Sequence, residues 1–599
     1  MKKNTVILQD QQSDKPCWLE FSNPLKVITT DHTNEVSAAM EAIQTYVDKG
    51  YYAAGYIAYE AAAGLNHKLK VRHGGTLPLL WFGIYTKPIN FIFHAQGHST
   101  DHDFNDRWQA SVNWTEYEQA LNAIKQRIYD GDTYQVNYSF RLHSQFRGNP
   151  WHFFQRLHAA QQAKYSAYLD LGRFKICSVS PELFVSLNAG KLTSLPMKGT
   201  VARGFSSQED AERASWLAES EKNRAENVMI VDMIRNDMSA IAGTTKIDAA
   251  SLFTIEKYPT VHQMVSLVSA QTKARPIEII KHMFPCASIT GAPKVKTMEI
   301  LSELENTARG VYTGSIGYIS PQHTMQFNVA IRTAVIDSEH QQVDYGVGGG
   351  ITWESDTRAE YEECLAKASV LTRIIPEFEL VETVLWQKDT RFYLLAEHLD
   401  RLAHSASYFS FHFNEATIRQ GLAKLVETTS NCNQKVRILL NRYGQVRLET
   451  NILNNLNGLK VCLSNTPTNT DNPFVFHKTS NRSIYKQALE QHPGCGDVIL
   501  WNERNEITES TFANIVIEEN GQLLTPPVHC GLLDGVLRSE LIKTQVLQEA
   551  VISKSRLLQA EAIYLINSVR GWMALTKAQD GWTIDSSARS AAPTKPQIK

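Results

Sequence analysis

The chain has 599 residues, too many for a single hydrophobic core, so two or more domains are expected. Hydrophobic residues make up 43% and charged residues 20%, and the net charge is -2 with both signs interspersed. The sequence has no basic block, which argues against a protein that binds nucleic acid or an anionic membrane surface. No apolar run reaches the roughly 18 residues of a membrane helix, and no signal peptide follows Met1, so the sequence predicts a cytoplasmic protein.

The first 110 or so residues are expected to contain strands. Residues 51–60 alternate aromatic and small side chains, as in a sheet packed on a core. A helix is predicted to begin near Trp114, because apolar residues then recur at helical spacing. Residues 135–142 alternate like a half-buried strand.

Two further strands, 176–179 and 183–187, lead to a turn at 188–190 and then to Leu195-Pro196-Met197-Lys198-Gly199-Thr200. Because proline fixes φ and glycine permits a tight turn, Lys198 is expected at the end of a strand on constrained backbone. An amine held in this way can act as a nucleophile if its surroundings lower its pKa. Taken alone, Lys198 would more often be a solvated surface lysine.

The segment from Glu226 to Asp237 mixes apolar and charged residues and is interpreted as a helix. Strands and glycine turns alternate from 311 to 351, and 357–367 has strong helix propensity. Pro376 ends that helix, after which the pattern restarts. We therefore predict domains over residues 1–376 and 377–585, followed by a disordered tail over 586–599 that has little to bury.

The eight cysteines are scattered and form no C-x-x-C pair. This arrangement favours reduced thiols over disulfides or a structural zinc site.

Several motifs accompany Lys198 in a defined order. They are Glu226 to Asp237, Ser288-Ile289-Thr290-Gly291-Ala292-Pro293-Lys294, Val311-Tyr312-Thr313-Gly314, Ile331-Arg332-Thr333, Gly348-Gly349-Gly350-Ile351 and Glu360-Tyr361-Glu362-Glu363. Together they resemble the chorismate-utilising enzymes over roughly residues 50 to 375. The resemblance implies an α+β fold, a sandwich of large antiparallel sheets. Within that family, aminodeoxychorismate synthases have lysine at the place of Lys198 and anthranilate synthases have alanine.

The resemblance also implies roles for the two residues at the centre of the chemistry. Lys198 attacks C2 of chorismate as the C4 hydroxyl leaves, and ammonia then attacks C4 and expels the lysine. Hydroxide is a poor leaving group, so an acid must protonate it, and Glu182 matches the family's acid. From the residues alone, Glu182 would more often be a solvated charge at a strand edge.

The carboxylate next to the ring is expected to be held by Mg²⁺, a hard cation that takes oxygen ligands. The resemblance assigns Glu226 and Glu363 as ligands. Glu360 lies one helical turn before Glu363 and is expected to help through bound water. Without the family, solvent-facing acids on helices would be the preferred interpretation.

The second carboxylate of chorismate needs cations and amide donors. Arg332, on a predicted strand, can bind it with two parallel hydrogen bonds. Glycine lets backbone N–H groups approach an anion closely. The further expected substrate contacts are Tyr312, Thr290, His262 and the amides of Gly348, Gly349 and Gly350.

A second set of motifs follows residue 378. It comprises Glu397-His398-Leu399-Asp400-Arg401, Lys478-Thr479-Ser480-Asn481-Arg482, Thr508-Glu509-Ser510 and Gly535-Val536-Leu537-Arg538. These resemble the pyridoxal-phosphate fold shared by branched-chain aminotransferases, D-amino-acid aminotransferases and 4-amino-4-deoxychorismate lyase, a smaller two-part α/β domain. The family's first strands are missing, so the first domain or a homodimer mate is expected to cover the exposed edge.

Pyridoxal 5'-phosphate makes three demands on such a domain. The resemblance assigns Lys478 as the lysine that binds it covalently and Glu509 as the carboxylate that keeps its pyridine nitrogen protonated. Arg401 is expected to bind the phosphate, together with the backbone at Val536 and Leu537, where a helix begins, and with Ser568. Alternatively, Arg401 is an exposed partner of Glu397 and Lys478 a loop lysine.

The two domains make chemical sense together, because the product of the first is the substrate of the second. This pairing predicts a bifunctional enzyme that makes 4-aminobenzoate for folate biosynthesis. A glutaminase needs a glycine-flanked nucleophilic cysteine in a tight turn, followed later by a His-x-Glu motif. Only Gly494-Cys495-Gly496 superficially resembles the cysteine turn, and it lies inside the second domain. A separate glutamine amidotransferase partner is therefore expected. The alternatives are an aminating synthase fused to an aminotransferase and a non-catalytic scaffold that binds the glutaminase. The sequence does not decide whether the amino-terminal sheet has a site for a tryptophan-like ligand.

Overall fold

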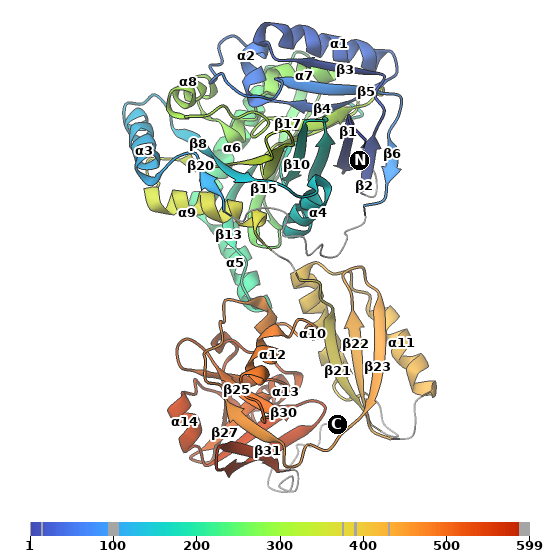
Figure 1. Cartoon of the computed structure of the whole chain (residues 1–599), viewed down its shortest axis with the longest axis vertical. Helices are drawn as coiled ribbons and strands as arrows, with labels where there is room; N and C mark the ends of the chain where they lie inside the picture. Colours follow the sequence, from blue (N-terminus) through green and yellow to red (C-terminus); the bar gives the residue numbers. More distant parts are fainter. Residues whose placement is uncertain are drawn as a thin grey trace. The chain divides into compact units, whose positions relative to one another are not determined.

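The computed structural model describes residues 2–12, 16–93, 107–373, 376–387, 392–428 and 432–585. It contains two compact units (Figure 1). The amino-terminal unit comprises Met1–Arg203 and Arg213–Ile375, and the carboxy-terminal unit comprises Gly204–Glu212 and Pro376–Lys599. The tail at 586–599, for which disorder is predicted, lies outside the described residues. In the described part of the chain, no helix has the length and apolar character needed to cross a bilayer.

The first sheet of the amino-terminal unit has ten antiparallel strands in the order β16-β8-β20-β19-β10-β9-β1-β2-β6, with β7 also on β8. Its strands are β1 (Thr5–Asp10), β2 (Cys17–Phe21), β6 (Ile89–Phe91), β7 (Gln109–Ala110), β8 (Gln135–Gln145), β9 (Tyr165–Asp170), β10 (Phe174–Ser180), β16 (Gly291–Ala292), β19 (Thr333–Asp337) and β20 (Gln342–Ile351). The long pairing of β8 with β20 sets Gly350 opposite Asn137 and Gly348 opposite Ser139.

The second sheet also has ten antiparallel strands, in the order β13-β15-β12-β11-β18-β17-β4-β5-β3, with β14 on β15. Its strands are β3 (Lys26–Thr30), β4 (Tyr52–Ile57), β5 (Leu80–Tyr85), β11 (Leu183–Asn188), β12 (Lys191–Leu195), β13 (Met197–Ala202), β14 (Thr245–Lys257), β15 (Val261–Gln271), β17 (Ser315–Ile319) and β18 (Met325–Val329). Buried side chains of both sheets, such as Leu8, Tyr56 and Ile316, share one hydrophobic cluster. The α+β sandwich of large antiparallel sheets is therefore confirmed.

Helices cover the outer faces of both sheets (Figure 1). They are α1 (Val36–Asp48), α2 (Ala62–Leu65), α3 (Trp114–Tyr129), α4 (Pro150–Gln161), α6 (Glu221–Ser239), α7 (Pro276–Met283), α8 (Lys294–Leu304) and α9 (Thr357–Ala368). Helix α5 (Ser207–Glu219) is divided between the two units at residue 213. Helix α3 begins at Trp114, as predicted, because Asn113 and Glu116 form a capping box. The helices predicted near Glu226 and at 357–367 correspond to α6 and α9.

The hairpin before Lys198 has the predicted form. Strands β11 and β12 pair antiparallel, with Asn188 opposite Lys191 and Leu183 opposite Leu195. Pro196 then interrupts the chain, and Lys198 lies on the next strand, β13, rather than at the end of β12.

The carboxy-terminal unit contains two sheets. The smaller has three strands, β21 (Leu380–Trp386), β22 (Gln434–Leu440) and β23 (Val446–Ile452), and shares a core with α10 (Leu395–Phe409) and α11 (Glu415–Thr428). The larger has nine strands, and the extra pairing of β26 with β27 closes part of it into a barrel. Its elements are β24 (Lys460–Leu463), β25 (Asp497–Trp501), β26 (Ile507–Ser510), β27 (Asn514–Glu519), β28 (Gln522–Thr525), β29 (Gln548–Glu549), β30 (Ala562–Asn567), β31 (Gly571–Ala578) and β32 (Gly581–Asp585), with α12 (Ser483–Glu490), α13 (Val536–Lys543) and α14 (Lys554–Gln559).

The prediction that all cysteines are reduced thiols is wrong for one pair. Cys462 and Cys495 form a disulfide, with their Cα atoms 6.1 Å apart. Strands β24 and β25 run side by side in parallel, and the Gly496 amide donates to the Lys460 carbonyl at 2.8 Å. This pairing brings two cysteines together that are 33 residues apart in sequence.

Candidate active sites

The backbone around Lys198 is fixed by helix α6. Gly199 has φ 92°, and a Cβ there would lie 3.0 Å from Asn223, so glycine allows β13 to approach the helix. Asn227 donates its Nδ2 to the Lys198 carbonyl at 3.4 Å and accepts from Ser266 at 2.5 Å. The strand that carries Lys198 is therefore held on constrained backbone, as the sequence predicts.

The amine of Lys198 reaches the start of β8 and the end of β20. A Cβ at Gly350 would lie 2.5 Å from Lys198 Nζ and 3.0 Å from Asn137 Oδ1. Burial lowers the pKa of Lys198, although nearby carboxylates oppose that shift. Those carboxylates belong to Glu226, Glu363 and Glu360. A lysine with a lowered pKa is neutral more often, which a nucleophilic amine requires.

Glu182 lies just before β11 and is buried. The Ser288 hydroxyl donates to its Oε1 at 2.6 Å. Burial raises the pKa of Glu182 to about 7, although the Ser288 hydrogen bond and the charge of Lys198 lower it. A carboxyl group with such a pKa can hold a proton near neutral pH and deliver it to a leaving group.

Helix α9 places two carboxylates and an ammonium group near Lys198. The Ser355 hydroxyl donates to Glu360 Oε1 at 2.7 Å. Lys367 Nζ pairs with Glu363 Oε1 at 2.7 Å and donates to the Gly348 carbonyl at 2.9 Å. Burial, with the neighbouring Glu363, raises the pKa of Glu360. The helix thus presents two carboxylates, one of which is paired with the ammonium of Lys367.

The prediction that Arg332 lies on a strand is wrong. Arg332 precedes β19 with φ 50°, a left-handed conformation that favours glycine. It has this conformation where the chain crosses from β18 in the second sheet to β19 in the first. Its guanidinium donates to the Lys367 carbonyl at the end of α9.

The other expected substrate contacts lie on neighbouring elements. The Thr290 hydroxyl follows the 3₁₀ turn η3 (Ala287–Ile289) and donates to the Ala287 carbonyl at 3.2 Å. The Tyr312 ring lies 4.9 Å from the Arg141 guanidinium, and burial raises the pKa of Tyr312 to about 12. His262 is buried on β15, opposite Val201 of β13.

A second site centres on Lys478 in the carboxy-terminal unit. Lys478 follows the 3₁₀ turn η5 (Pro473–Val475), and its carbonyl accepts from the Val381 amide of β21 at 2.9 Å. Burial lowers the pKa of Lys478 to about 8, and the charges of Arg401 and Arg482 add to this shift. Lys478 is therefore a half-buried lysine beside two cations, not a solvated loop lysine.

Arg401 of α10 is held by Glu382 of β21. Its Nε and Nη2 donate to the two oxygens of Glu382, each at 2.8 Å, and its Nη1 donates to the Asp534 carbonyl at 2.8 Å. Glu382 also bonds His398 Nδ1 at 2.6 Å, and His398 Nε2 lies 2.9 Å from Ser568 Oγ. Arg401 is thus not an exposed partner of Glu397.

The remaining features of the second site are a buried pair of polar side chains, Tyr485 and Glu509, and the start of helix α13. The Tyr485 hydroxyl donates to Glu509 Oε1 at 2.6 Å, and burial raises the pKa of Glu509 to about 7. Val536 and Leu537 are the first residues of α13, whose N-cap is Gly535. The amides at a helix start lack helical acceptors and can bind a phosphate.

Comparison with known families matches residues 4–373 to the chorismate binding enzymes and residues 379–578 to the class IV aminotransferases. This chain belongs to the chorismate binding enzyme family. Its residues 379–578 add a class IV aminotransferase domain to that chorismate binding enzyme.

Several known proteins are similar to part of this chain. Aminodeoxychorismate synthase component 1 of Escherichia coli (strain K12) is 37% identical over 289 residues, which are 48% of this chain and 63% of that protein. The Bacillus subtilis (strain 168) protein of the same name is 39% identical over 261 residues, 43% of this chain and 55% of that protein. The chain thus spans less than two thirds of these relatives' length.

A solved structure supports the same fold. The crystal structure of anthranilate synthase component I from Streptococcus pneumoniae TIGR4 superposes with a TM-score of 0.52 at 22% identity, covering 62% of this chain and 93% of that chain. At this identity the likeness shows the fold of the chorismate binding enzyme alone.

The donors near Lys198 fit Mg²⁺ in their chemistry. Carboxylate oxygens are its preferred protein ligands. The carboxylates of Glu226, Glu360 and Glu363 all raise the pKa of Lys198 through their charge. Over the described ranges, however, no three His, Cys, Asp or Glu side chains converge as a metal cage. Instead, the ammonium of Lys367 lies on Glu363.

The residues of the second site fit pyridoxal phosphate. Lys478 is half-buried with a lowered pKa, and Glu509 is a buried carboxylate near it. Arginine has five N–H groups. Three of those of Arg401 are bonded to Glu382 and Asp534, and no acceptor for the other two is found in the part of the chain that the structure describes, so they can bind a phosphate.

Two amides beside Lys198 were not expected from the sequence. Gln135 is fully buried, and neither its Nε2 nor its Oε1 has a hydrogen-bond partner among the described residues. Asn137 donates Nδ2 to the Ser288 carbonyl at 2.8 Å. A buried amide without partners costs about 1–3 kcal/mol, so Gln135 is available to a ligand. Their spacing of two on a strand, which puts both on one face, was the missed signal.

Glu382 and His398 were also missed in the second site. His398 and Arg401 are three residues apart and therefore share a face of α10, which the sequence could have revealed. Glu382 could not be assigned in this way, because its partners lie on another element.

Proposed function

We propose that this chain makes 4-aminobenzoate for folate biosynthesis from chorismate and ammonia in two steps. Residues 1–376 would replace the C4 hydroxyl of chorismate by an amino group, and residues 377–585 would then eliminate pyruvate. One observation carries the first step: the amine of Lys198, with a lowered pKa, lies within electrostatic reach of Glu182, whose pKa is raised to about 7.

The first step needs two displacements. The neutral amine of Lys198 forms a bond to C2, and the C4 hydroxyl leaves as water with a proton from Glu182. Ammonia then forms a bond to C4 while the bond between C2 and the Lys198 nitrogen breaks. Chorismate and ammonia are thereby converted to 4-amino-4-deoxychorismate and water, and retention at C4 follows from the two displacements.

The substrate's carboxylates would be held from two sides. Mg²⁺, when bound by Glu226 and Glu363 with Glu360 behind a water, supplies a hard cation for the ring carboxylate. Arg332 would bind the other carboxylate. Further contacts would come from Thr290, Tyr312, His262 and the amides of Gly348, Gly349 and Gly350.

In the second step, Lys478 removes a proton from C4 of aminodeoxychorismate. Pyridoxal phosphate, when bound, supplies an electron sink for the carbon that carries the amine. A pKa of about 8 leaves part of Lys478 neutral near pH 7, as a base requires. Pyruvate then leaves and the ring becomes aromatic, which drives the step. Arg401, Ser568 and the amides of Val536 and Leu537 would bind the phosphate, and Glu509 would contact the pyridine nitrogen.

A separate glutamine amidotransferase would supply the ammonia. The similar proteins from Escherichia coli and Bacillus subtilis are named component 1, which fits a chain that works with a second component. Cys495, the glycine-flanked cysteine, is bonded to Cys462 and is therefore not a free nucleophile.

The second step has one rival, because residues 379–578 match the class IV aminotransferases. Purified chain should be given 4-amino-4-deoxychorismate and, separately, D-alanine or branched-chain amino acids with 2-oxoglutarate. A lyase releases pyruvate and 4-aminobenzoate from the first mixture without any keto acid. Glutamate formation from the second mixture, without 4-aminobenzoate in the first, would favour the aminotransferase.

Replacing Glu182 with glutamine should slow the amination by about 10²- to 10⁴-fold, the usual range for a general acid. Because burial raises the pKa of Glu182 to about 7, the acid is protonated below that pH. The kcat of the wild type should therefore fall as pH rises through about 7. A pH profile of kcat tests this. Glu339→Gln, at an exposed site, serves as the control and should keep the wild-type profile. If Glu182→Gln showed the same fall of kcat above about pH 7, the assignment of Glu182 as the acid would be wrong.

Replacing Glu363 with glutamine should raise the Mg²⁺ requirement of the amination. Removing a group that hydrogen-bonds a metal ligand lowers metal affinity by about 10- to 100-fold. Loss of the ligand itself should therefore raise the half-saturating Mg²⁺ concentration by about 10-fold or more. Glu362→Gln is a matched control, because Glu362 pairs with Arg358 instead. Equal Mg²⁺ titrations for the two variants would rule out Glu363 as a ligand.

A further inference from the structure

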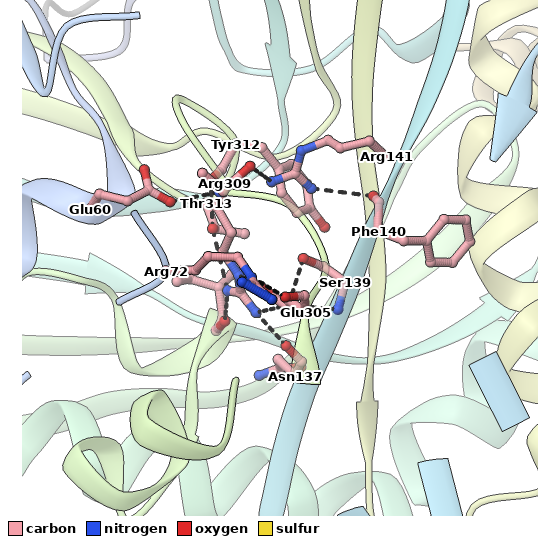
Figure 2. Close-up of polar contacts among 12 residues, drawn as sticks. Glu60, Arg72, Asn137, Ser139, Phe140, Arg141, Glu305, Arg309, Tyr312 and Thr313 are labelled. Atoms are coloured by element: carbon pink, nitrogen blue, oxygen red, sulfur yellow. Dashed lines mark hydrogen bonds and ion pairs between the residues drawn. The ribbon is translucent and has the colours of Figure 1, made fainter. Parts of the chain in front are cut away.

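Arg309 is the centre of a buried polar network in the amino-terminal unit (Figure 2). Its side chain is 2% exposed, and its guanidinium lies 4.5 Å from the centre of the Tyr59 ring. Nε and Nη2 donate to the two oxygens of Glu305 at 2.9 and 2.7 Å. The other acceptors are the carbonyls of Ile289 and Asn137 and the hydroxyl of Thr313, at 3.0, 2.6 and 3.4 Å. All five N–H groups of the guanidinium therefore have acceptors.

Those last three acceptors each adjoin a group of the candidate site. Asn137 is the residue whose side chain lies beside Gly350 and Lys198. Ile289 stands between Ser288, which donates to Glu182, and Thr290. Thr313 follows Tyr312. Through these hydrogen bonds the planar guanidinium of Arg309 connects the segments around Asn137, Ile289 and Thr313, which are separate in sequence.

The arginine is itself fixed from behind. Its backbone amide and that of Gly310 donate to the two oxygens of Glu60 at 2.6 and 2.9 Å. Glu305 also accepts from the amide and the hydroxyl of Ser139 on β8, at 2.9 and 2.8 Å. Figure 2 shows Glu60 on one side of Arg309 and Ser139 and Asn137 on the other. The guanidinium therefore has a single orientation relative to β8.

We propose that Arg309 is a positioning residue of the amination site, setting the distances between the Lys198 surroundings, the Ser288–Glu182 pair and Tyr312. This inference rests on the proposed function. Reacting groups displaced by about 1 Å can lose about 10²-fold in rate. Lysine cannot replace a planar fork that makes five directed hydrogen bonds, although it keeps the charge.

Arg309→Lys tests the inference in the full chain. The expected result is a fall in the amination kcat of about 10²-fold, larger than any rise in the chorismate KM. The alkaline limb of the pH profile should also move to higher pH, since the Ser288 hydrogen bond that lowers the pKa of Glu182 is loosened. Unchanged kcat and an unchanged limb in a folded variant would overturn the inference.

Hydrogen exchange gives a readout that does not depend on activity. In Arg309→Lys, the amides of Asn137, Thr290 and Thr313 should all exchange faster than in the wild type. This increase should be larger than that of amides elsewhere in the amino-terminal unit. Arg173→Lys is the control, because Arg173 makes a similar fork to Asp337 away from this network. Unchanged exchange in the three segments would overturn the inference, even if the chain proved to have no amination activity.

If Arg309→Lys does not fold, Glu60→Gln takes its place. Glutamine keeps the shape but offers one acceptor oxygen to the two amides of Arg309 and Gly310. The same three segments should then exchange faster and kcat should fall by a smaller factor. A wild-type kcat, pH limb and exchange pattern in this variant would refute the positioning role. Absence of amination in the wild type, by contrast, would refute the proposed function itself.

Discussion

Replacing Lys198 with alanine is expected to lower the formation of 4-amino-4-deoxychorismate by about 10³-fold or more, because no other group supplies the first displacement. Chorismate affinity should change little, since the predicted carboxylate ligands stay in place. The measurement is a steady-state assay with chorismate, ammonium and Mg²⁺, with the product followed by mass spectrometry. In the wild type, rapid quenching should also capture a peptide in which Lys198 carries the mass of dehydrated chorismate.

The control for Lys198→Ala is Lys191→Ala, an exposed lysine of the same hairpin. It should retain wild-type turnover. If Lys198→Ala retained comparable turnover, or if no adduct formed on the Lys198 peptide under conditions that give product, the nucleophile would have to be another group.

Lys478→Ala should separate the two reactions. We expect 4-aminobenzoate formation to fall by about 10³-fold or more, because the base and the covalent anchor of the cofactor are lost together. Aminodeoxychorismate should accumulate, since Lys198 and its surroundings lie in the other unit. Product ratios from chorismate and ammonium measure this effect, and borohydride reduction should no longer fix pyridoxal phosphate to the chain.

Lys486→Ala is the matched control, since that lysine is exposed on α12 and pairs with Glu490. It should leave both the cofactor attachment and the product ratio unchanged. Continued 4-aminobenzoate formation by Lys478→Ala at the wild-type rate would exclude Lys478 as the base.

Much of the architecture is a local property of the sequence. Alternation predicted β8, because side-chain periodicity reports which face is buried. The turn residues at 188–190 predicted the β11–β12 hairpin, and helix propensity predicted α9. Lys198 and Glu182 could be assigned because their motifs are contiguous and resemble a family. Their roles stay predictions, which the Lys198→Ala and Glu182→Gln variants test.

Other features depend on contacts that no local pattern contains. Arg332 was predicted on a strand, yet it turns the chain between two sheets, a crossing visible only in the tertiary structure. The Cys462–Cys495 disulfide requires β24 and β25 to lie side by side. The Glu382–Arg401 pair likewise joins a strand and a helix whose proximity is set by packing.

The most direct test of the account gives the purified chain chorismate, nitrogen-15-labelled ammonium, Mg²⁺ and pyridoxal phosphate, without any other protein. The expected products are 4-aminobenzoate that carries one labelled nitrogen and an equal amount of pyruvate. Labelled anthranilate, or no aminated product at all, would rule out the two-step function proposed above.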